Sequence, residues 1–280
     1  MPVAMAWPQA TWLNGQLHIG GGWTGDNESD RVLISYTPQG KYTTRKTPTT
    51  WYGLTNYQSH IVTVGGQEPT SHGGWRSTDK IWLLQQEDWT SDAIPPMPTR
   101  RYSPAAIAVG YLLMVAGGQV NNGDDLDVVE VFDNKSKIWR TIETLPRPCS
   151  FMSSSLNDRH LVLANRFNGK DVYRCSVDSL SSDPSSLQWE SLPDVPYQHS
   201  SIVRCQDVLL SLGGGPVYSY WSTTIYFLHG VAWQPIGELP IAVTGHCTTI
   251  LPSGEVVPIG GYTDSGYSPR VFRLTIRGEL

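Results

Sequence analysis

Short apolar segments that run directly into paired glycines recur along the chain. They lie at residues 17–22, 62–66, 113–118, 209–215 and 256–261, and residues 161–165 show the same apolar run but end in Ala164-Asn165. Each run has the length and composition of a β-strand. Six positions, one in each run, are taken as equivalent: Gly21, Gly65, Gly117, Ala164, Gly213 and Gly260. The gaps between successive positions are 44, 52, 47, 49 and 47 residues. The pattern predicts six copies of one structural unit, with a period of about 48 residues.

Each unit contains further matching parts. Two-residue turns precede the apolar runs, several of them of types that tolerate positive φ in tight hairpins: Asn14-Gly15, Gln58-Ser59, Gly110-Tyr111, Asn157-Asp158, Gln206-Asp207 and Ser253-Gly254. After the glycines, a polar loop leads to a third apolar strand at residues 31–36, 80–84, 127–132, 171–177, 223–228 and 270–274. A turn then leads to an aromatic residue in five units: Tyr42, Trp89, Trp139, Trp189 and Trp233. Each unit is therefore predicted to form four short strands joined by turns.

A glycine doublet that closes an apolar strand, followed by an aromatic residue and a tryptophan at a period near 50, resembles the kelch repeat. The fourth unit departs from that pattern because it lacks the glycine pair, and the first has Tyr42 where tryptophan is usual. The resemblance implies an all-β fold, a six-bladed β-propeller with four strands per blade. We expect one domain over residues 1–280, with repeats at about 1–46, 47–98, 99–146, 147–194, 195–240 and 241–280. Radial packing of such sheets buries both faces of each against its neighbours, which independently favours a propeller.

Closure of the ring is the open point of this prediction. Only eight residues follow Phe272, so the sixth unit has three strands and no outer tryptophan strand of its own. Either residues 3–6 supply a short outer strand for this blade, or the closing strand is missing because the chain is a fragment. We favour the first alternative.

Composition agrees with an all-β chain and narrows its partners. The chain has 27 glycines and 20 prolines in 280 residues, and 16% of its residues are charged, against about 25% in a typical soluble domain. The net charge is −5, with no basic stripe, so neither nucleic acid nor an anionic membrane is an expected partner. The longest apolar stretch, residues 105–118, is too short to span a bilayer. We expect this chain to be monomeric.

Cysteine usage predicts the compartment. The four cysteines are far apart in the sequence and form no CxxC motif: Cys149, Cys175, Cys205 and Cys247. This pattern is too sparse for a disulfide scaffold and wrong for a structural zinc site. No signal peptide is recognisable in the first residues. We therefore expect reduced thiols and a cytoplasmic location, against which two glycosylation sequons at Asn27 and Asn134 argue only weakly.

A search for catalytic motifs finds none. The glycine pairs are not followed by a helix, as a nucleotide-binding loop requires, and no GxSxG, HExxH or P-loop motif is present. His199 and His246 each lie 14 residues before a glycine doublet, so we expect them at equivalent positions near one end of the central channel. We predict no catalytic residue, no cofactor and no metal. Kelch-like propellers also include a copper oxidase family acting on sugars, but no spacing here resembles its cysteine–tyrosine pair and two histidine ligands.

One face of the predicted ring collects an unusual set of loop residues. The loops between strands two and three share a face with the loops that join successive blades, and aromatic and arginine side chains dominate binding hot spots. The candidate ligand-binding residues on this face are Trp23, Trp75, Arg76, Arg101, Tyr102, Arg147, Arg166, Tyr197, His199, Tyr218, Trp221, His246, Tyr262 and Tyr267. We expect about half of the aromatic side chains to fold back onto the blade edges instead of facing a ligand.

Two classes of function follow. The first is a non-catalytic module that binds a peptide or protein on this face, with acidic partners favoured because the arginines could pair with carboxylates. The resemblance to kelch proteins implies the same role, since many of them recognise substrates or act as scaffolds. The alternative is a propeller enzyme that acts on a sugar or another small molecule, with or without a metal. The absence of any catalytic motif favours the first.

Overall fold

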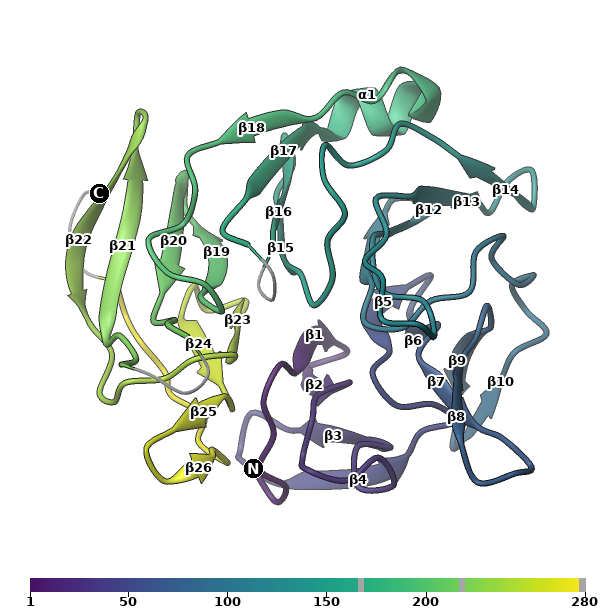
Figure 1. The fold of residues 1–280 in the computed structure, drawn as a ribbon, viewed down its shortest axis with the longest axis horizontal. Coiled ribbons are helices and arrows are strands. Elements are labelled where there is room, and N and C mark those ends of the chain that lie inside the picture. The colour runs from purple at the N-terminus through teal and green to yellow at the C-terminus, as the bar shows by residue number, and fades with distance from the viewer. Residues whose placement is uncertain (166–168, 217–219, 277–280) are drawn as a thin grey trace.

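The strands are arranged radially around a central axis, in the order of the chain (Figure 1). The computed structural model describes residues 1–165, 169–216 and 220–276. The first sheet contains β1 (Gln9–Leu13), β2 (Gln16–Gly20), β3 (Val32–Tyr36) and β4 (Tyr42–Lys46). The second contains β5 (Gly53–Tyr57), β6 (His60–Val64), β9 (Ile81–Gln85) and β10 (Asp88–Thr90), with β7 (Gln67–Pro69) and β8 (Trp75–Ser77) forming a separate hairpin.

Three more four-stranded antiparallel sheets continue the ring. The third contains β11 (Ala105–Val109), β12 (Leu112–Ala116), β13 (Val129–Asp133) and β14 (Ile138–Thr141). The fourth contains β15 (Ser153–Leu156), β16 (His160–Ala164), β17 (Val172–Ser176) and β18 (Glu190–Leu192), and α1 (Val177–Ser182) and the 3-10 turn η1 (Pro184–Ser186) lie between its last two strands. The fifth contains β19 (Ser201–Cys205), β20 (Val208–Leu212), β21 (Thr224–His229) and β22 (Ala232–Glu238). The prediction of an all-β propeller built from four-stranded sheets is confirmed for these five units.

The core lies between neighbouring sheets, which is why the second strand of a unit is apolar on both faces. All five residues of β12 are buried. Val62 and Ile81 of the second sheet share one cluster with Leu113 and Phe132 of the third. A strand that is buried on both faces reads as a continuous apolar run in the sequence, and this is the signal that revealed the repeat.

The outer-strand tryptophans fill the gaps between sheets, as predicted. The indole N–H groups of Trp89, Trp139 and Trp233 each donate to a main-chain carbonyl of the preceding unit, at 2.8–3.1 Å. The three acceptors are the carbonyl oxygens of Lys46, Pro95 and Pro193. Each indole therefore joins two units by apolar contact and by a hydrogen bond.

The glycine doublets receive the chain segment that enters the next unit. The second glycine of four doublets donates its N–H to a carbonyl of that segment at 2.8–2.9 Å, as Gly66 does to Arg101 and Gly118 to Cys149. A Cβ atom on Gly117 would lie 2.3 Å from the carbonyl oxygen of Cys149, and this residue has a φ of +59°. Only glycine allows so close an approach in this conformation.

The sixth repeat differs from the other five. Its regular strands are β23 (Cys247–Ile250) and β24 (Val256–Ile259), with the short hairpin β25 (Tyr262–Thr263) and β26 (Gly266–Tyr267) beyond them. Residues 270–274 lie antiparallel to β24 and pair with it through two isolated bridges, Ile259 with Val271 and Val256 with Leu274. Five four-stranded sheets are thus present in the described residues, not six.

The N-terminal segment closes the ring in a way that the sequence did not predict. Residues 3–6 form no outer strand. Instead, the carbonyl of Met5 accepts from Gly261 at 2.8 Å, and Ala6 forms a bridge with Trp23. Met5 therefore occupies the place that Arg101 and Cys149 occupy at other junctions. The first residues act as the connection between the last unit and the first, because the inward position leaves the segment no access to the outer edge.

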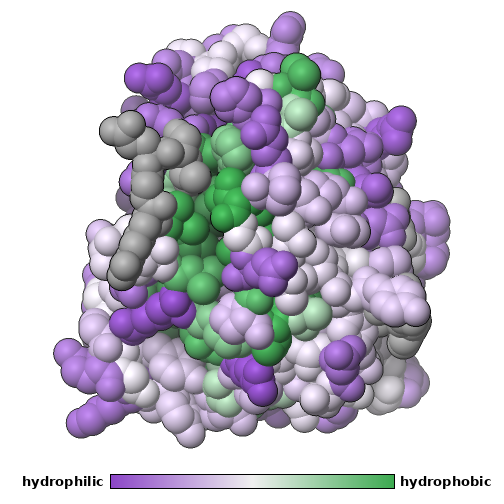
Figure 2. Space-filling model, turned by 90° about the vertical axis from the view of Figure 1, so that its left-hand side faces the viewer, coloured by the Kyte–Doolittle hydropathy of each residue, from purple (hydrophilic) through white to green (hydrophobic). Residues whose placement is uncertain are grey.

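One side of the ring has a stretch of apolar surface. Figure 2 views the side on which β21 and β22 lie and shows hydrophobic residues gathered in a hollow there. The fifth and sixth units share an apolar cluster, whose half-buried members include Ile236 of β22, Ile250 of β23 and Leu274.

Loss of an outer-strand indole should destabilise the protein strongly. We expect Trp139→Ala to lower the free energy of unfolding by about 3–5 kcal/mol, because it removes the ring packed against Phe132 at 5.4 Å and the hydrogen bond to Pro95. Trp139→Phe keeps part of the packing and should lose less. Urea denaturation measures both variants, and an alanine variant as stable as the wild type would contradict this role.

Candidate functional site

Six residues with positive φ surround the central axis at the point where the chain enters each unit. Each lies two residues before an innermost strand and has a φ of 50–60°: Trp7, Trp51, Ser103, Phe151, His199 and Gly245. Such a conformation is uncommon for any residue other than glycine and is a clear outlier for bulky ones. Its recurrence in every repeat shows that the fold imposes it.

Main-chain hydrogen bonds join these residues from one unit to the next. Trp7 donates its N–H to the carbonyl of Gly245, and Gly245 donates to His199 at 2.9 Å. Phe151 donates to Ser103 at 3.1 Å, and Ser103 donates to Trp51 at 2.6 Å. The six residues are named here the inner ring. Their φ angle turns each N–H toward the preceding unit, so the ring holds the mouth of the channel rigidly.

Aromatic side chains of the inner ring fill the mouth of the channel. Phe151 makes edge-to-face contacts with Trp51 at 5.1 Å and with Trp7 at 6.3 Å between ring centroids. The indole N–H of Trp7 donates to Nδ1 of His199 at 3.3 Å. Trp7, Phe151 and His199 are buried, whereas Trp51 is partly exposed. Offset and edge-to-face arrangements of this kind stabilise aromatic clusters.

A belt of half-buried aromatic residues extends outward from this centre. Trp23 stacks on Trp51 at 5.3 Å, and Tyr102 and Tyr267 pack against the same cluster. Tyr267 meets Tyr262 edge-to-face at 5.1 Å, and Tyr262 meets Trp221 in the same way at 5.5 Å. The aromatic belt is defined by the five residues Trp23, Tyr102, Tyr262, Tyr267 and Trp221. All five were candidates from the sequence, and the structure brings them together.

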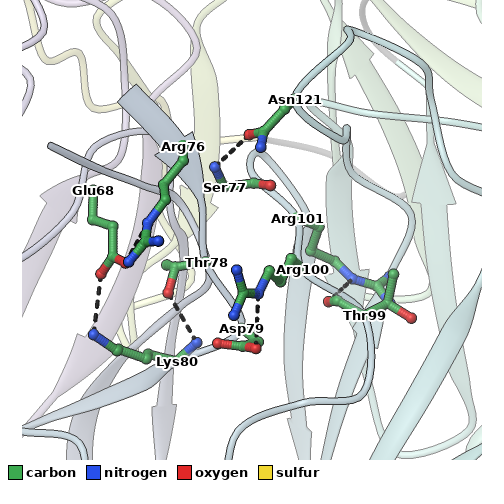
Figure 3. Close-up of polar contacts among 10 residues, drawn as sticks. All are labelled: Glu68, Arg76, Ser77, Thr78, Asp79, Lys80, Thr99, Arg100, Arg101 and Asn121. Atoms are coloured by element: carbon green, nitrogen blue, oxygen red, sulfur yellow. Dashed lines mark hydrogen bonds and ion pairs between the residues drawn. The ribbon is translucent and has the colours of Figure 1, made fainter. Parts of the chain in front are cut away.

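Arg101 lies elsewhere than the sequence suggested. Its side chain is fully buried, and so is that of Glu130, to which Nη2 donates at 2.7 Å. Nη1 donates to the carbonyls of Gly117 and Val128, and Nε donates to that of Thr99 (Figure 3). Burial lowers the pKa of Arg101, and the carboxylate of Glu130 opposes that effect. Arg101 is a structural residue and contributes no charge to the open face.

The exposed arginines of this face already have carboxylate partners within the chain. Arg76 donates to Glu68 at 2.8 and 3.1 Å, and Arg100 donates to Asp79 at 3.1 Å (Figure 3). Arg147, whose side chain is 74% exposed, pairs with Asp171 at 3.3 Å. In the described part of this face the three arginines therefore lie in ion pairs and do not concentrate positive charge, because the partner carboxylates come from neighbouring loop and strand positions.

The two candidate histidines do not occupy equivalent positions. His199 belongs to the inner ring, but its counterpart in the sixth unit is Gly245, and His246 is the next residue. The two hairpins differ in register. In the fifth unit Ser201 pairs with Leu212, 11 positions later in the sequence, whereas in the sixth unit Cys247 pairs with Ile259, 12 positions later. The hairpin of the sixth unit thus has one additional residue. His246 is fully buried and lies against the glycine doublets of the fifth and sixth units.

The remaining candidates lie away from the belt. Trp75 is half-buried and pairs with Pro69 in the β7–β8 hairpin. Tyr197 is 38% exposed, and its ring centroid lies 6.2 Å from that of Tyr226 in β21. Its side chain therefore folds back onto a blade edge. Arg166 and Tyr218 lie outside the described residues.

Sequence reasoning missed Trp7 and Phe151, which form the centre of the cluster. Both belong to the column of residues that precedes the innermost strand by two positions. Aligning the six units at that column, instead of at the glycine doublets alone, would have placed them beside His199 and Trp51. Their positive φ has no sequence signature, because the column contains two Trp, one Phe, one His and one Ser and only one glycine.

Asp30 fixes the loop that carries Trp23. Its Oδ1 accepts from the main-chain N–H of Thr24 at 2.6 Å and from the hydroxyl of Thr24 at 2.8 Å. Its Oδ2 is buried and has no hydrogen-bond donor among the described residues. Burial raises the pKa of Asp30 to about 7, although the two bonds from Thr24 act in the opposite direction. The loop beside Trp23 therefore depends on a carboxyl group that titrates near neutral pH.

The channel below the aromatic centre is narrow. A cavity of about 50 Å³ lies among the innermost strands and is lined by residues such as Gln9, Ser153 and Thr248. This volume holds no more than one or two water molecules. Across the described ranges, no three His, Cys, Asp or Glu side chains are grouped as a metal site would require. Nor does any described helix have the length and apolarity to cross a membrane.

Comparisons with known proteins identify the repeat. The family model described as the kelch motif matches residues 100–146. Kelch-like protein 33 of Homo sapiens is 27% identical over 119 residues, which are 42% of this chain and 22% of that protein. Alpha-scruin of Limulus polyphemus is 22% identical and matches 90% of this chain and 30% of its own length. An F-box/kelch-repeat protein of Arabidopsis thaliana is 26% identical over 65% of this chain and 43% of its own.

A solved structure matches nearly the whole chain. The structure of YjhT superposes with a TM-score of 0.81 at 15% sequence identity, covering 99% of this chain and 96% of that one. At this identity the likeness concerns the fold. The chain spans less than half the length of each of the three relatives above.

Two arginines of similar position in the sequence repeat should differ sharply in their contribution to stability. Arg101→Ala leaves the buried carboxylate of Glu130 with the hydroxyl of Thr99 but without its cationic partner, and we expect it to lower the free energy of unfolding by about 3–5 kcal/mol. Arg147→Ala should change it by no more than about 0.5 kcal/mol, since that ion pair is exposed. Urea denaturation measures the free energy of unfolding of both variants. Similar losses for Arg101→Ala and Arg147→Ala would refute the structural role of Arg101.

The raised pKa of Asp30 makes stability depend on pH. The folded protein holds this proton more tightly than the unfolded chain, whose carboxyl has a pKa near 3.8, so the contribution of Asp30 falls as the pH rises from about 4 to about 7. Each pKa unit corresponds to about 1.4 kcal/mol. Relative to wild type, Asp30→Asn should gain stability over that range, as measured by urea denaturation at several pH values. If the free energy of unfolding changed with pH in the same way for both proteins, the raised pKa of Asp30 would be refuted.

Proposed function

Because this chain is a kelch-repeat β-propeller, we propose that it is a non-catalytic interaction module that binds a segment of a partner protein across the aromatic belt. The observation that carries this proposal is the gathering of five half-buried Trp and Tyr side chains on one face, around a rigid centre. Aromatic residues with one buried and one accessible side are the type most enriched at binding hot spots.

The rigidity of the inner ring supports this function. Main-chain hydrogen bonds hold the bases of the belt residues, and ring contacts fix several of the side chains. A surface that is already ordered loses little conformational entropy when a ligand binds. The belt joins elements of the first, third, fifth and sixth units, so an extended segment could contact several units at once.

The ion pairs of the face indicate the chemistry of the partner. A carboxylate on the partner would have to displace Glu68, Asp79 or Asp171 from its own arginine. Contact with the belt requires no such exchange. We therefore propose a partner segment in which apolar, aromatic or proline side chains make the main contacts, since aromatic-lined grooves bind such segments well. Acidic residues would contribute at the edge of the contact.

We further propose that residues 241–276 form the sixth blade of the ring, with Met5 and Ala6 as its link to the first. Gly245 of this unit belongs to the inner ring, and the Gly261 N–H receives the chain as the other doublets do. The strand that residues 270–274 add to β24 has the place of a third strand. This arrangement gives the face the same loops at every position around the axis.

The proposal is tested by selecting ligands and then removing the belt. Peptides selected from a random 12-residue display library on the wild-type protein should bind Trp23→Ala and Trp221→Ala at least about tenfold more weakly, because each variant removes a hot-spot side chain. Affinities are measured by fluorescence anisotropy, and melting temperatures establish that the variants are folded.

Tyr42→Ala is the matched control. Tyr42 lies on the outer strand β4, is 52% exposed and is away from the belt. Its affinity for the selected peptides should stay within about twofold of wild type. Peptides that bind the belt variants as well as they bind Tyr42→Ala, or a selection that enriches no peptide, would refute the proposed function.

A further inference from the structure

The fourth unit contains a pocket at the opposite end of the strands from the aromatic belt. Between β17 and β18 the chain inserts residues 177–189, including α1 and η1, where β9 and β10 of the second unit are joined by only two residues. A cavity of about 370 Å³ lies beside this insertion. It is lined by His160, Arg174, Cys175, Ser176, Ser179, Ser186, Gln188, Trp189 and Glu190.

Basic groups outnumber acidic ones around this cavity. Burial lowers the pKa of His160, and the charges of Arg174, Arg204 and Arg159 lower it further, with only Glu190 acting in the opposite direction. Burial also lowers the pKa of Arg204, as does the nearby charge of Arg174. These mutual effects show that the positive groups lie close to one another. Two carboxylates, Glu190 beside Arg174 and Asp207 beside Arg204, face three guanidinium groups, so the region keeps an excess of positive charge that attracts anions.

Several hydrogen-bond donors at the pocket have no acceptor among the described residues. Arg174 uses Nε and Nη2 for Glu190, at 2.6–3.1 Å, which leaves both N–H groups of Nη1 without a bond. The indole Nε1 of Trp189 is buried and has no acceptor either. A buried donor without a partner destabilises the protein by about 1–3 kcal/mol, so a ligand that supplies the acceptor would be favoured.

Trp189 is an exception among the outer-strand tryptophans. Trp89, Trp139 and Trp233 lie within their strands and donate to the preceding unit. Trp189 instead precedes β18 by one residue, because the insertion delays the start of that strand. Its indole therefore lines the pocket, and its N–H is not used to join two units.

We propose that this pocket is a binding site for a phosphoryl group or a similar multivalent oxyanion. Arg174 supplies the two N–H groups of Nη1, which have no acceptor among the described residues, Ser179 and Gln188 add neutral donors at the wall, and the guanidinium groups of Arg159 and Arg204 provide positive potential. A tetrahedral anion with several acceptor oxygens matches such a set of donors. A single carboxylate matches it less well, since Glu190 already satisfies one side of Arg174.

The indole of Trp189 provides a direct readout. In a ¹H–¹⁵N TROSY spectrum of the full chain, its Nε1 resonance is assigned by its loss in Trp189→Phe. Titration with sodium phosphate, against sodium chloride at matched ionic strength, should move this resonance along a saturable curve. Arg174→Gln should weaken the apparent affinity at least about fivefold. Arg76→Gln removes another arginine that is paired with a glutamate, on the other face, and should leave the affinity within about twofold.

A second titration identifies the source of the phosphoryl group. A short phosphoserine peptide that binds more tightly than phosphate indicates a modified protein segment, and phosphate that binds at least as well indicates a small phosphorylated molecule. Either result supports the site. No saturable shift with either probe, or equal affinity of wild type and a folded Arg174→Gln variant, overturns the proposal. The peptides selected on the wild-type protein and then measured on the belt variants test the other face, so the two proposals fail independently.

Discussion

The main-chain hydrogen bonds of the inner ring set the geometry on which the rest of the molecule depends. Each bond joins the entrance of one unit to the entrance of the next, at the position where neighbouring strands approach the axis most closely. The N–H can reach the preceding unit only because φ is positive at this residue. A four-stranded sheet on its own leaves both faces and both edges uncovered, and the ring fixes neighbouring sheets at the spacing that buries their faces.

Two further contacts transmit this arrangement outward. At intermediate radius, the second glycine of a doublet donates its N–H to the segment that enters the next unit. At the outer edge, the indoles of Trp89, Trp139 and Trp233 donate to carbonyl groups of the preceding unit. Between the last unit and the first, main-chain atoms reproduce two of these three contacts: the carbonyl of Met5 accepts from Gly261, and the N–H of Trp7 donates to Gly245. The first unit has Tyr42 in place of the outer-strand tryptophan.

The fold was predictable because its signals are local and repeated. An apolar run, a glycine doublet and an aromatic residue at fixed spacing identify the strand, the close approach and the filled gap without knowledge of distant residues. The errors concern interactions between distant positions. Arg101 resembles any loop arginine in the sequence, and its burial depends on Glu130, 29 residues away. The misplacement of His246 follows from one additional residue in a hairpin, which a comparison of average spacing cannot detect.

The candidate site was predictable in its composition and less so in its charge. Belt residues such as Trp23 and Trp221 follow from their loops, since a propeller places those loops on one face whatever their sequence. Pairing between charged loops does not follow, because Glu68 and Asp171 could face any direction until the backbone is known. The aromatic centre was missed for the same reason: Trp7 and Phe151 come from units that are not adjacent, and they meet only across the axis.

The strained conformation of the inner ring bears on function as well as on folding. Positive φ at a bulky residue costs about 1–3 kcal/mol, and glycine would avoid this cost, as it does at Gly245. For Trp7 and Phe151, burial of the ring offsets the strain, since an apolar side chain of this size gains about 1.5–3 kcal/mol. Trp51 is only partly buried, so burial of its side chain offsets less of the strain. Trp51 stacks on the ring of Trp23, and its indole N–H donates to the side-chain amide oxygen of Asn27 in the same loop. The positive φ that the fold imposes at Trp51 therefore also fixes the position of Trp23 in the aromatic belt.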